Sequence, residues 1–252
     1  MKFELQKELR YALRSGRILI LFASLLFLAL LTPIMLKVVL PQVLGGQVSD
    51  LMTMTQLDCI QSYLGDVFEI GGIVIAFTLC GLTASELQGD TWLLPVCAGK
   101  RFGHMVGAKL LVFGSLLVIL PVATLLVDYL YSSYLFGFQV GVSAVLISGI
   151  LQSIYLIFFL SCLIMWGVLT RKPIPTGFLT LATAYGIQVI SSLFGIQKWT
   201  PSGLLTHAME LNPILDSSLW IPLVVTVLLI ATTIRITTSK LKCMEWSTRS
   251  AQ

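Results

Sequence analysis

Six long segments with almost no charged residues constrain this sequence more than any motif does. The first covers residues 18–36 and contains no charged side chain. An α-helix rises about 1.5 Å per residue, so about 20 apolar residues cross the ~30 Å hydrocarbon core of a bilayer. The remaining segments cover residues 67–83, 105–127, 140–169, 177–194 and 219–234. We expect each of the six to be a transmembrane helix.

The composition places the whole chain in the membrane class. Only 11% of its 252 residues are charged, whereas soluble domains carry about 25%. The mean hydropathy is +0.92. Little length is left for a soluble domain outside the six segments. We therefore expect an all-α integral membrane protein with one transmembrane domain over residues 1–252.

Residues 1–16 have the pattern of an amphipathic helix next to the first span. Apolar side chains recur at helical spacing along one face, at Met1, Leu5, Leu9, Ala12 and Leu13. Lysine, arginine and glutamate residues occupy the rest of the surface. This pattern predicts an interfacial helix whose basic groups face anionic headgroups, so membrane lipid is an expected partner.

The distribution of basic residues predicts the orientation. With the N-terminus inside, 14 of the 16 Lys and Arg residues are cytoplasmic, and only Lys37 and Lys198 lie outside. The inside set is Lys2, Lys7, Arg10, Arg14, Arg17, Lys100, Arg101, Lys109, Arg171, Lys172, Arg235, Lys240, Lys242 and Arg249. The positive-inside rule therefore predicts a cell-membrane protein with both termini in the cytoplasm.

Residues 85–103 form the longest polar-interrupted segment on the predicted cytoplasmic side. The acidic residues Glu86 and Asp90 come first, and an apolar strip begins at Trp92 and continues through Leu93 and Leu94. We expect Asp90 or Thr91 to cap a short helix whose first turn holds Trp92 and Leu93. A short helix with an exposed apolar strip and charged ends fits a groove on a soluble partner. The alternative is a plain interfacial loop.

The sequence has none of the motifs that would give it chemistry of its own. It contains no HExxH zinc motif and no GxxxxGK[ST] phosphate-binding loop. It carries no basic stripe for nucleic acid, and its five cysteines form no CxxC pair. We therefore expect no enzyme activity, metal or bound cofactor. The sequence assigns no role to Cys59, His104 or His207.

Charged residues within the spans are few. Glu69 and Asp128 are expected near the outer interface, because Glu69 comes early in the segment 67–83 and Asp128 directly follows 105–127. Ion-driven carriers usually need ionisable residues near the bilayer midplane, so this placement argues against that class. Gln152 and Gln188 are uncharged, and such residues usually make hydrogen bonds between helices.

The segment 85–103 and the six-span topology together resemble the permease of ABC transporters of the type-2 exporter family, whose membrane domain is shared with the ABC G subfamily. The family pattern has Glu, then Gly-Thr, a Leu pair, Arg and a Lys entering the third span. The matching residues are Glu86, Gly89, Thr91, Leu93, Leu94, Arg101, Gly107 and Lys109. The chain departs from the pattern at Ala98, where proline is usual.

The resemblance implies a subunit that a separate ATP-binding subunit powers. That partner would use the ATP, and the contact would be made through Glu86, Gly89, Asp90, Thr91, Trp92, Leu93, Leu94 and Arg101. A second permease copy, or a related permease, would complete the transporter. The second and fifth spans would line the central pathway, which makes Glu69 and Gln188 candidate pathway residues.

We therefore expect the permease subunit of an exporter for a hydrophobic or amphipathic cargo, such as a peptide antibiotic, a drug or a lipid. Two other readings stay open from the residues alone: an ATP-independent carrier, and a membrane protein that gives immunity to a toxin. The sequence does not identify the cargo. It also does not decide between pairing with an identical and with a related subunit.

Overall fold

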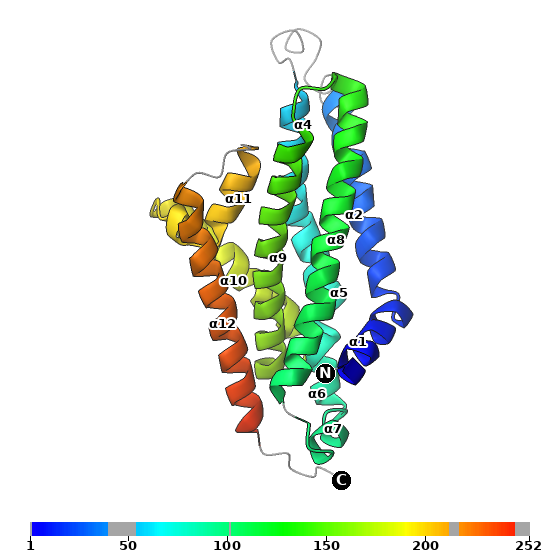
Figure 1. Ribbon diagram of the computed structural model, residues 1–252, viewed down its shortest axis with the longest axis vertical. Helices are drawn as coiled ribbons and strands as arrows, with labels where there is room; N and C mark the ends of the chain where they lie inside the picture. The colour runs from blue at the N-terminus through cyan, green and yellow to red at the C-terminus, as the bar shows by residue number, and fades with distance from the viewer. Residues whose placement is uncertain (1, 40–53, 101, 212–216, 245–252) are drawn as a thin grey trace.

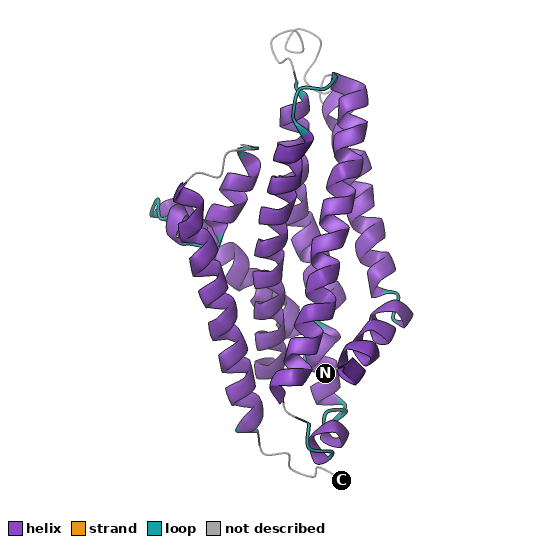
Figure 2. Cartoon of the chain, in the orientation of Figure 1, coloured by secondary structure: helices purple, strands orange, loops and turns teal. Residues whose placement is uncertain are grey.

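The chain folds into an all-helical bundle in a computed structural model that describes residues 2–39, 54–100, 102–211 and 217–244. No strand occurs in these residues (Figure 2). Six helical runs among these residues are long and apolar enough to cross a membrane, which is the number of spans that the sequence predicts. They are Arg17–Val39, Gln56–Gln88, Phe102–Phe136, Val142–Thr170, Pro173–Leu193 and Trp220–Lys242.

Several helices make up the first two runs. The amphipathic helix α1 (Lys2–Arg14) precedes the first run, which joins α2 (Arg17–Ile34) to the π-helix η1 (Met35–Val39). The second run joins α4 (Gln56–Asp66), the π-helix η2 (Val67–Gly71), α5 (Gly72–Leu79) and α6 (Gly81–Gln88). Gly16 has a left-handed φ of +70°, which lets the chain change direction between α1 and α2.

The remaining elements follow in chain order. After the short helix α7 (Leu93–Cys97) come the long spans α8 (Phe102–Phe136), α9 (Val142–Thr170) and α10 (Pro173–Leu193). The 3₁₀ turn η3 (Gln197–Trp199) precedes the short helix α11 (Ser202–Met209). The 3₁₀ turn η4 (Ser217–Leu219) leads into α12 (Trp220–Lys242).

Helix α9 is the centre of the bundle, with α8 beside it (Figure 1). In its most apolar stretch 78% of the residues are buried, against 22% in α12 at the edge. Helices α1, α6 and α7 lie at one end of the bundle, together with the last turn of α12. We call this the α7 end. The start of α4 and the last turn of α8 lie at the other end, the α4 end.

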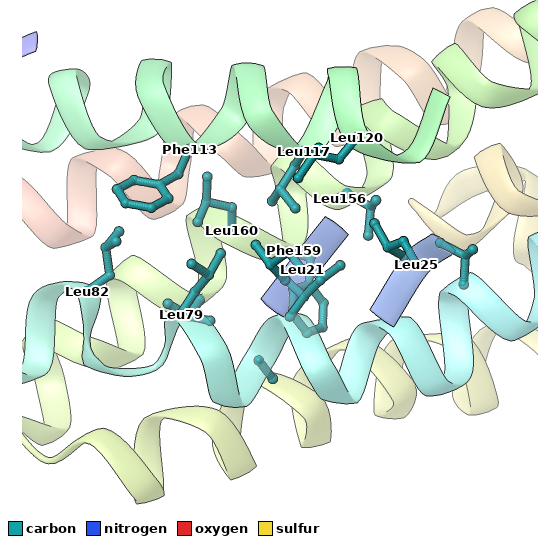
Figure 3. Packing of buried hydrophobic residues seen from close by; sticks show 14 of the residues in the cluster. Leu21, Leu25, Leu79, Leu82, Phe113, Leu117, Leu120, Leu156, Phe159 and Leu160 are labelled. Carbon is teal, nitrogen blue, oxygen red and sulfur yellow. The ribbon is translucent and has the colours of Figure 1, made fainter. Parts of the chain in front are cut away.

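Leucine and phenylalanine side chains from four spans fill the core (Figure 3). Leu21 and Leu25 of α2 belong to the same buried cluster as Phe113 and Leu117 of α8 and Phe159 of α9. Two glycines of α9 allow close approach. A Cβ on Gly149 would lie 2.9 Å from Leu125 of α8, and a Cβ on Gly167 would lie 3.2 Å from Thr83 of α6. Such small residues are typical where membrane helices pack tightly.

The second helical run is longer than the predicted segment 67–83, because residues 56–66 form helix α4 directly before it. Thr55 and Asp58 form a capping box: the Asp58 carboxylate accepts from the Thr55 backbone N–H at 2.9 Å. One face of α4 is buried through Cys59, Ile60, Tyr63 and Leu64. The polar residues of α4 lower the hydropathy of this segment, so the apolar pattern of the sequence did not predict a helix here.

The other helix ends differ by smaller amounts. Helix α8 continues nine residues beyond the predicted end at 127, and α12 continues eight beyond 234. Helix α10 begins at Pro173 and not at 177, because proline is well tolerated in the first helical turn. In α8 the stretch between Lys109 and Asp128 has no charge, and its length of ~29 Å matches a ~30 Å hydrocarbon core.

Candidate functional site at the α7 end

Helix α6 ends in a tight turn that carries most of the predicted coupling residues. The Gly89 N–H donates to the Ser85 carbonyl at 3.0 Å. Both the backbone N–H and the hydroxyl of Thr91 donate to the Glu86 carbonyl, each at 3.0 Å. Asp90 takes a left-handed φ of +51°. The Thr91 hydroxyl therefore closes α6 and does not cap the next helix, contrary to one of the two predicted caps.

Helix α7 follows directly and is closed by a glycine. The Val96 N–H donates to the Trp92 carbonyl at 3.2 Å, so Trp92 precedes the helix and Leu93 begins it. At the other end, Gly99 has a φ of +76°, and its N–H and that of Lys100 donate to the carbonyls of Val96 and Pro95. This is the Schellman arrangement, for which glycine is the favoured residue.

Trp92 is completely buried, so it cannot belong to the exposed apolar strip expected from the sequence. Its indole Nε1–H donates to Glu86 Oε2 at 2.6 Å, and its ring stacks on Phe102 with 6.5 Å between centroids. A buried tryptophan needs a partner for its N–H, and Glu86 provides it. The side chain fastens the turn to α6 and α8 and is not available to a soluble partner.

Lys109 of α8 is the centre of a buried ion cluster that sequence reasoning missed. Its side chain is only 1% exposed, and its Nζ lies 3.0 Å from both carboxylate oxygens of Glu8 and 2.9 Å from Glu86 Oε2. Glu8 comes from α1 and Glu86 from α6. One ammonium thus holds three helices together, and its charge is matched by carboxylates, as a buried charge requires.

Two weaker ion pairs surround this cluster. Lys100 Nζ lies 3.7 Å from Glu4 Oε1, and Lys7 Nζ lies 4.0 Å from Glu86 Oε1. The three lysines and three glutamates sum to zero formal charge. They line a cavity of about 30 Å³ together with Pro95 and Met105, which is too small for a substrate. Joining helices, and not binding cargo, is what this arrangement can do.

The tip of the turn is polar. Asp90 and Thr91 are exposed at its tip. Leu93 and Leu94 form the first residues of α7. Arg101 lies outside the described residues. Among the predicted coupling residues whose exposure is described, Gly89, Asp90 and Thr91 are exposed, Glu86 is mostly buried and Trp92 is fully buried.

Glu69, one of the two predicted pathway residues, belongs to a helical run that is longer than the predicted segment 67–83. Because α4 extends the second run to Gln56–Gln88, Glu69 stands ~5 Å from the middle of that run. Its side chain is exposed on the surface of the single chain. It belongs to the π-helix η2, a geometry often found at functional sites.

Tyr185 of α10 connects Glu69 to the second predicted pathway residue. Its hydroxyl donates to the Glu69 carbonyl at 2.6 Å, and its ring packs edge-on against Phe68 at 5.2 Å. A side-chain donor of this kind supports the carbonyls of a widened helical turn. Gln188 is half-buried and follows Tyr185 by one turn. Tyr185 therefore joins α10, the helix that carries Gln188, to the backbone at Glu69.

Buried polar groups also join α4 to α8 near the α4 end. Asp128 is fully buried, and the Cys59 thiol lies 3.9 Å from its Oδ1. One turn away, the Tyr63 hydroxyl donates to Thr124 Oγ1 at 2.7 Å.

The two histidines lie apart from these groups. His207 lies 3.2 Å from Glu210, and His104 is exposed at the start of α8. In residues 2–39, 54–100, 102–211 and 217–244, no three metal-ligating side chains are grouped together.

Comparisons of the chain with protein families, with curated proteins and with solved structures find no match.

Proposed function

We propose that this chain is the membrane-spanning subunit of an ABC exporter, driven by a separate ATP-binding subunit. The observation that carries the proposal is the folded unit of residues 85–100, a turn and short helix latched to the membrane helices by the Lys109 cluster. A plain interfacial loop needs no such attachment. A segment through which a partner moves the spans needs a stiff one.

The Lys109 cluster provides that stiffness because Glu86, Lys109 and Glu8 belong to three different helices, α6, α8 and α1. Movement of the turn displaces Glu86, Glu86 is paired with Lys109 of α8, and Lys109 is paired with Glu8 of α1. The exposed Asp90 and Thr91 at the tip are the residues that the ATP-binding subunit contacts. Glu86 and Trp92 act behind them as positioning residues.

A second copy of the chain, or a related permease, completes the transporter along the side that carries Glu69. Ionisable side chains at membrane depth face a protein interior or a water-filled cavity, whereas Glu69 is exposed on the single chain. A second subunit provides that polar environment. Glu69 and Gln188 then line a pathway between the two subunits, and Tyr185 orients the π-turn. The cargo is a hydrophobic or amphipathic molecule.

The same glutamate favours a second candidate function. A carboxylate near the middle of a span is typical of ion-coupled carriers, and Glu69 stands near the middle of the helical run Gln56–Gln88. An ATP-independent carrier would use Glu69 for proton or cation exchange. Such a carrier would not need residues 85–100 to be held to the membrane helices by the Lys109 cluster.

A pull-down in mild detergent from native membranes tests the proposal. We expect an ATP-binding subunit to co-purify in equal amount with the wild-type chain and to be lost with Asp90→Arg, a change at an exposed residue outside the ion cluster. Lys172→Glu reverses a charge at the same end of the bundle, on an exposed turn, and serves as the control. Purification of the wild-type chain alone, with transport persisting in proteoliposomes without any ATPase, would establish the carrier instead.

A further inference from the structure

Helix α1 has three distinct faces. With 100° between successive residues, Glu4, Glu8 and Ala12 lie on one face, and all three are buried. Leu5, Leu9 and Leu13 lie on the next, where Leu9 and Leu13 are 48% and 64% exposed. The third face carries the exposed cations Lys7, Arg10 and Arg14. Glu4 and Glu8 are thus turned inward, Arg10 and Arg14 are turned outward, and Lys7, which is 54% exposed, lies 4.0 Å from Glu86.

An open groove of about 400 Å³ lies between the leucine face of α1 and the side of α8. Leu5, Gln6 and Leu9 line it from α1, and Val112 and Ser115 line it from α8. The Ser115 hydroxyl donates to the Val112 carbonyl at 2.9 Å, so it is satisfied within its own helix. The α8 wall of the groove is therefore effectively apolar, and Gln6 stands at the edge next to the basic face.

The depth of the groove matches the start of the hydrocarbon core. Val112 and Ser115 follow Lys109 by three and six residues, or ~4.5 and ~9 Å along α8. Each leaflet contributes about 15 Å of hydrocarbon. The groove thus spans the outer part of one leaflet, where acyl chains meet headgroups. The basic residues of the chain assign that leaflet to the cytoplasmic side.

We propose that this groove binds an anionic phospholipid of that leaflet. One acyl chain lies against Leu5, Leu9 and Val112, and the phosphate faces Arg10 and Arg14. Charge complementarity selects the occupant, because the exposed side of α1 presents cations beside the groove while Glu4 and Glu8 are buried against lysines. A zwitterionic lipid would fill the groove equally well but would gain less from the two arginines.

The groove exists before any lipid enters it, because the ion cluster fixes its α1 wall. Glu8 is adjacent to Leu9, and its partner Lys109 lies one turn from Val112. The same lysine pairs with Glu86. The bound lipid is therefore in contact with the helix that latches residues 85–100. This inference concerns lipid binding and does not depend on the proposed ATP-binding partner.

The test is a lipid titration of the purified, delipidated full chain followed by native mass spectrometry. Dioleoyl phosphatidylglycerol and dioleoyl phosphatidylcholine serve as probes of equal chain length. We expect one site with tighter binding of phosphatidylglycerol. Arg10→Gln and Arg14→Gln should each weaken that binding about five-fold and leave phosphatidylcholine unchanged. The pair Arg171→Gln and Lys172→Gln, exposed at the same end of the bundle, serves as the control.

Two further variants test the groove itself. Ser115→Trp fills it, and Leu9→Asn makes its α1 wall polar; both should lose the phosphatidylglycerol site. Ile119→Trp and Leu13→Asn place the same changes on exposed positions of the same helices outside the groove and should keep it. Equal binding of the two lipids, or retention of the site in both groove variants, would overturn the proposal. A loss of dimer mass in Ser115→Trp with lipid binding intact would assign the groove to a protein contact.

Discussion

Glu8 and Lys109 are 101 residues apart in the sequence, yet Lys109 Nζ lies 3.0 Å from both Glu8 carboxylate oxygens. The pair joins the first helix of the chain to the third span. Both side chains are almost fully buried, at 6% and 1% exposure. Because both groups are buried, removing either one leaves the other as an unpaired buried charge and should lower the stability of the protein.

Lys109→Met should destabilise the protein strongly. The change leaves Glu8 and Glu86 buried without their cation, and removal of one partner from a buried ion pair typically costs about 3–5 kcal/mol. Unfolding in detergent, followed by tryptophan fluorescence, measures the loss. Lys100→Met is the control, because Lys100 is 41% exposed in its pair with Glu4. Similar melting temperatures for the two variants would show that the Lys109 cluster contributes nothing special.

Trp92→Phe should destabilise the turn after α6 and leave the transmembrane helices folded. Phenylalanine keeps an aromatic ring for Phe102 but cannot donate to Glu86, and a hydrogen bond to a charged group contributes about 1.5–3 kcal/mol. Hydrogen exchange of peptides covering residues 86–100 should become faster. Trp220→Phe, a change at a 61% exposed tryptophan, should leave these peptides unchanged. Unaltered exchange in Trp92→Phe would contradict the role given to its N–H.

Tyr185→Phe should destabilise the π-turn at Glu69. The variant retains the ring that packs on Phe68 and removes only the hydroxyl that donates to the Glu69 carbonyl. We expect a loss of about 1 kcal/mol, with faster hydrogen exchange in residues 67–75. Tyr134→Phe, at an 86% exposed tyrosine, is the matched control. If both variants exchange at wild-type rates, the tyrosine does not support the turn.

Glu69 should be reachable by water in native membranes. In a chain without its own cysteines, Glu69→Cys should react with a charged, water-soluble maleimide, because the thiolate needed for the reaction forms only in a polar environment. Ile119→Cys and Val227→Cys, at exposed apolar positions, should not react. Absence of labelling at position 69 as well would place Glu69 against lipid or a dry interface and remove it from the pathway.

The sequence predicted the six spans because their apolar composition depends on no tertiary contact. It failed at α4, where Gln56, Asp58, Gln61 and Asp66 resemble a loop although Thr55 and Asp58 carry a recognisable capping box. Because of that error, the predicted second span began at residue 67, so Glu69 was expected near its end, whereas it stands near the middle of the helical run Gln56–Gln88.

The ion cluster was hidden for a different reason. Counting charges placed Lys109 on the cytoplasmic side, but no local pattern shows which carboxylates it meets. One signal was present: Glu4 and Glu8 share a face of α1 with Ala12, which is unusual for solvated glutamates. The exposed tip at Asp90 and the burial of Trp92 likewise depend on how α6 and α8 pack, and residue type alone favoured the opposite for the tryptophan.

The long separation between Glu8 and Lys109 also has a consequence for synthesis. A ribosome adds about 5–20 residues per second, so Glu8 emerges ~5–20 s before the lysine that pairs with it. Until the third span enters the membrane, Glu4 and Glu8 of α1 lack their lysine partners, so the inner face of α1 cannot be buried as it is in the folded chain. Closure of the cluster therefore marks the moment at which the first half of the chain is complete.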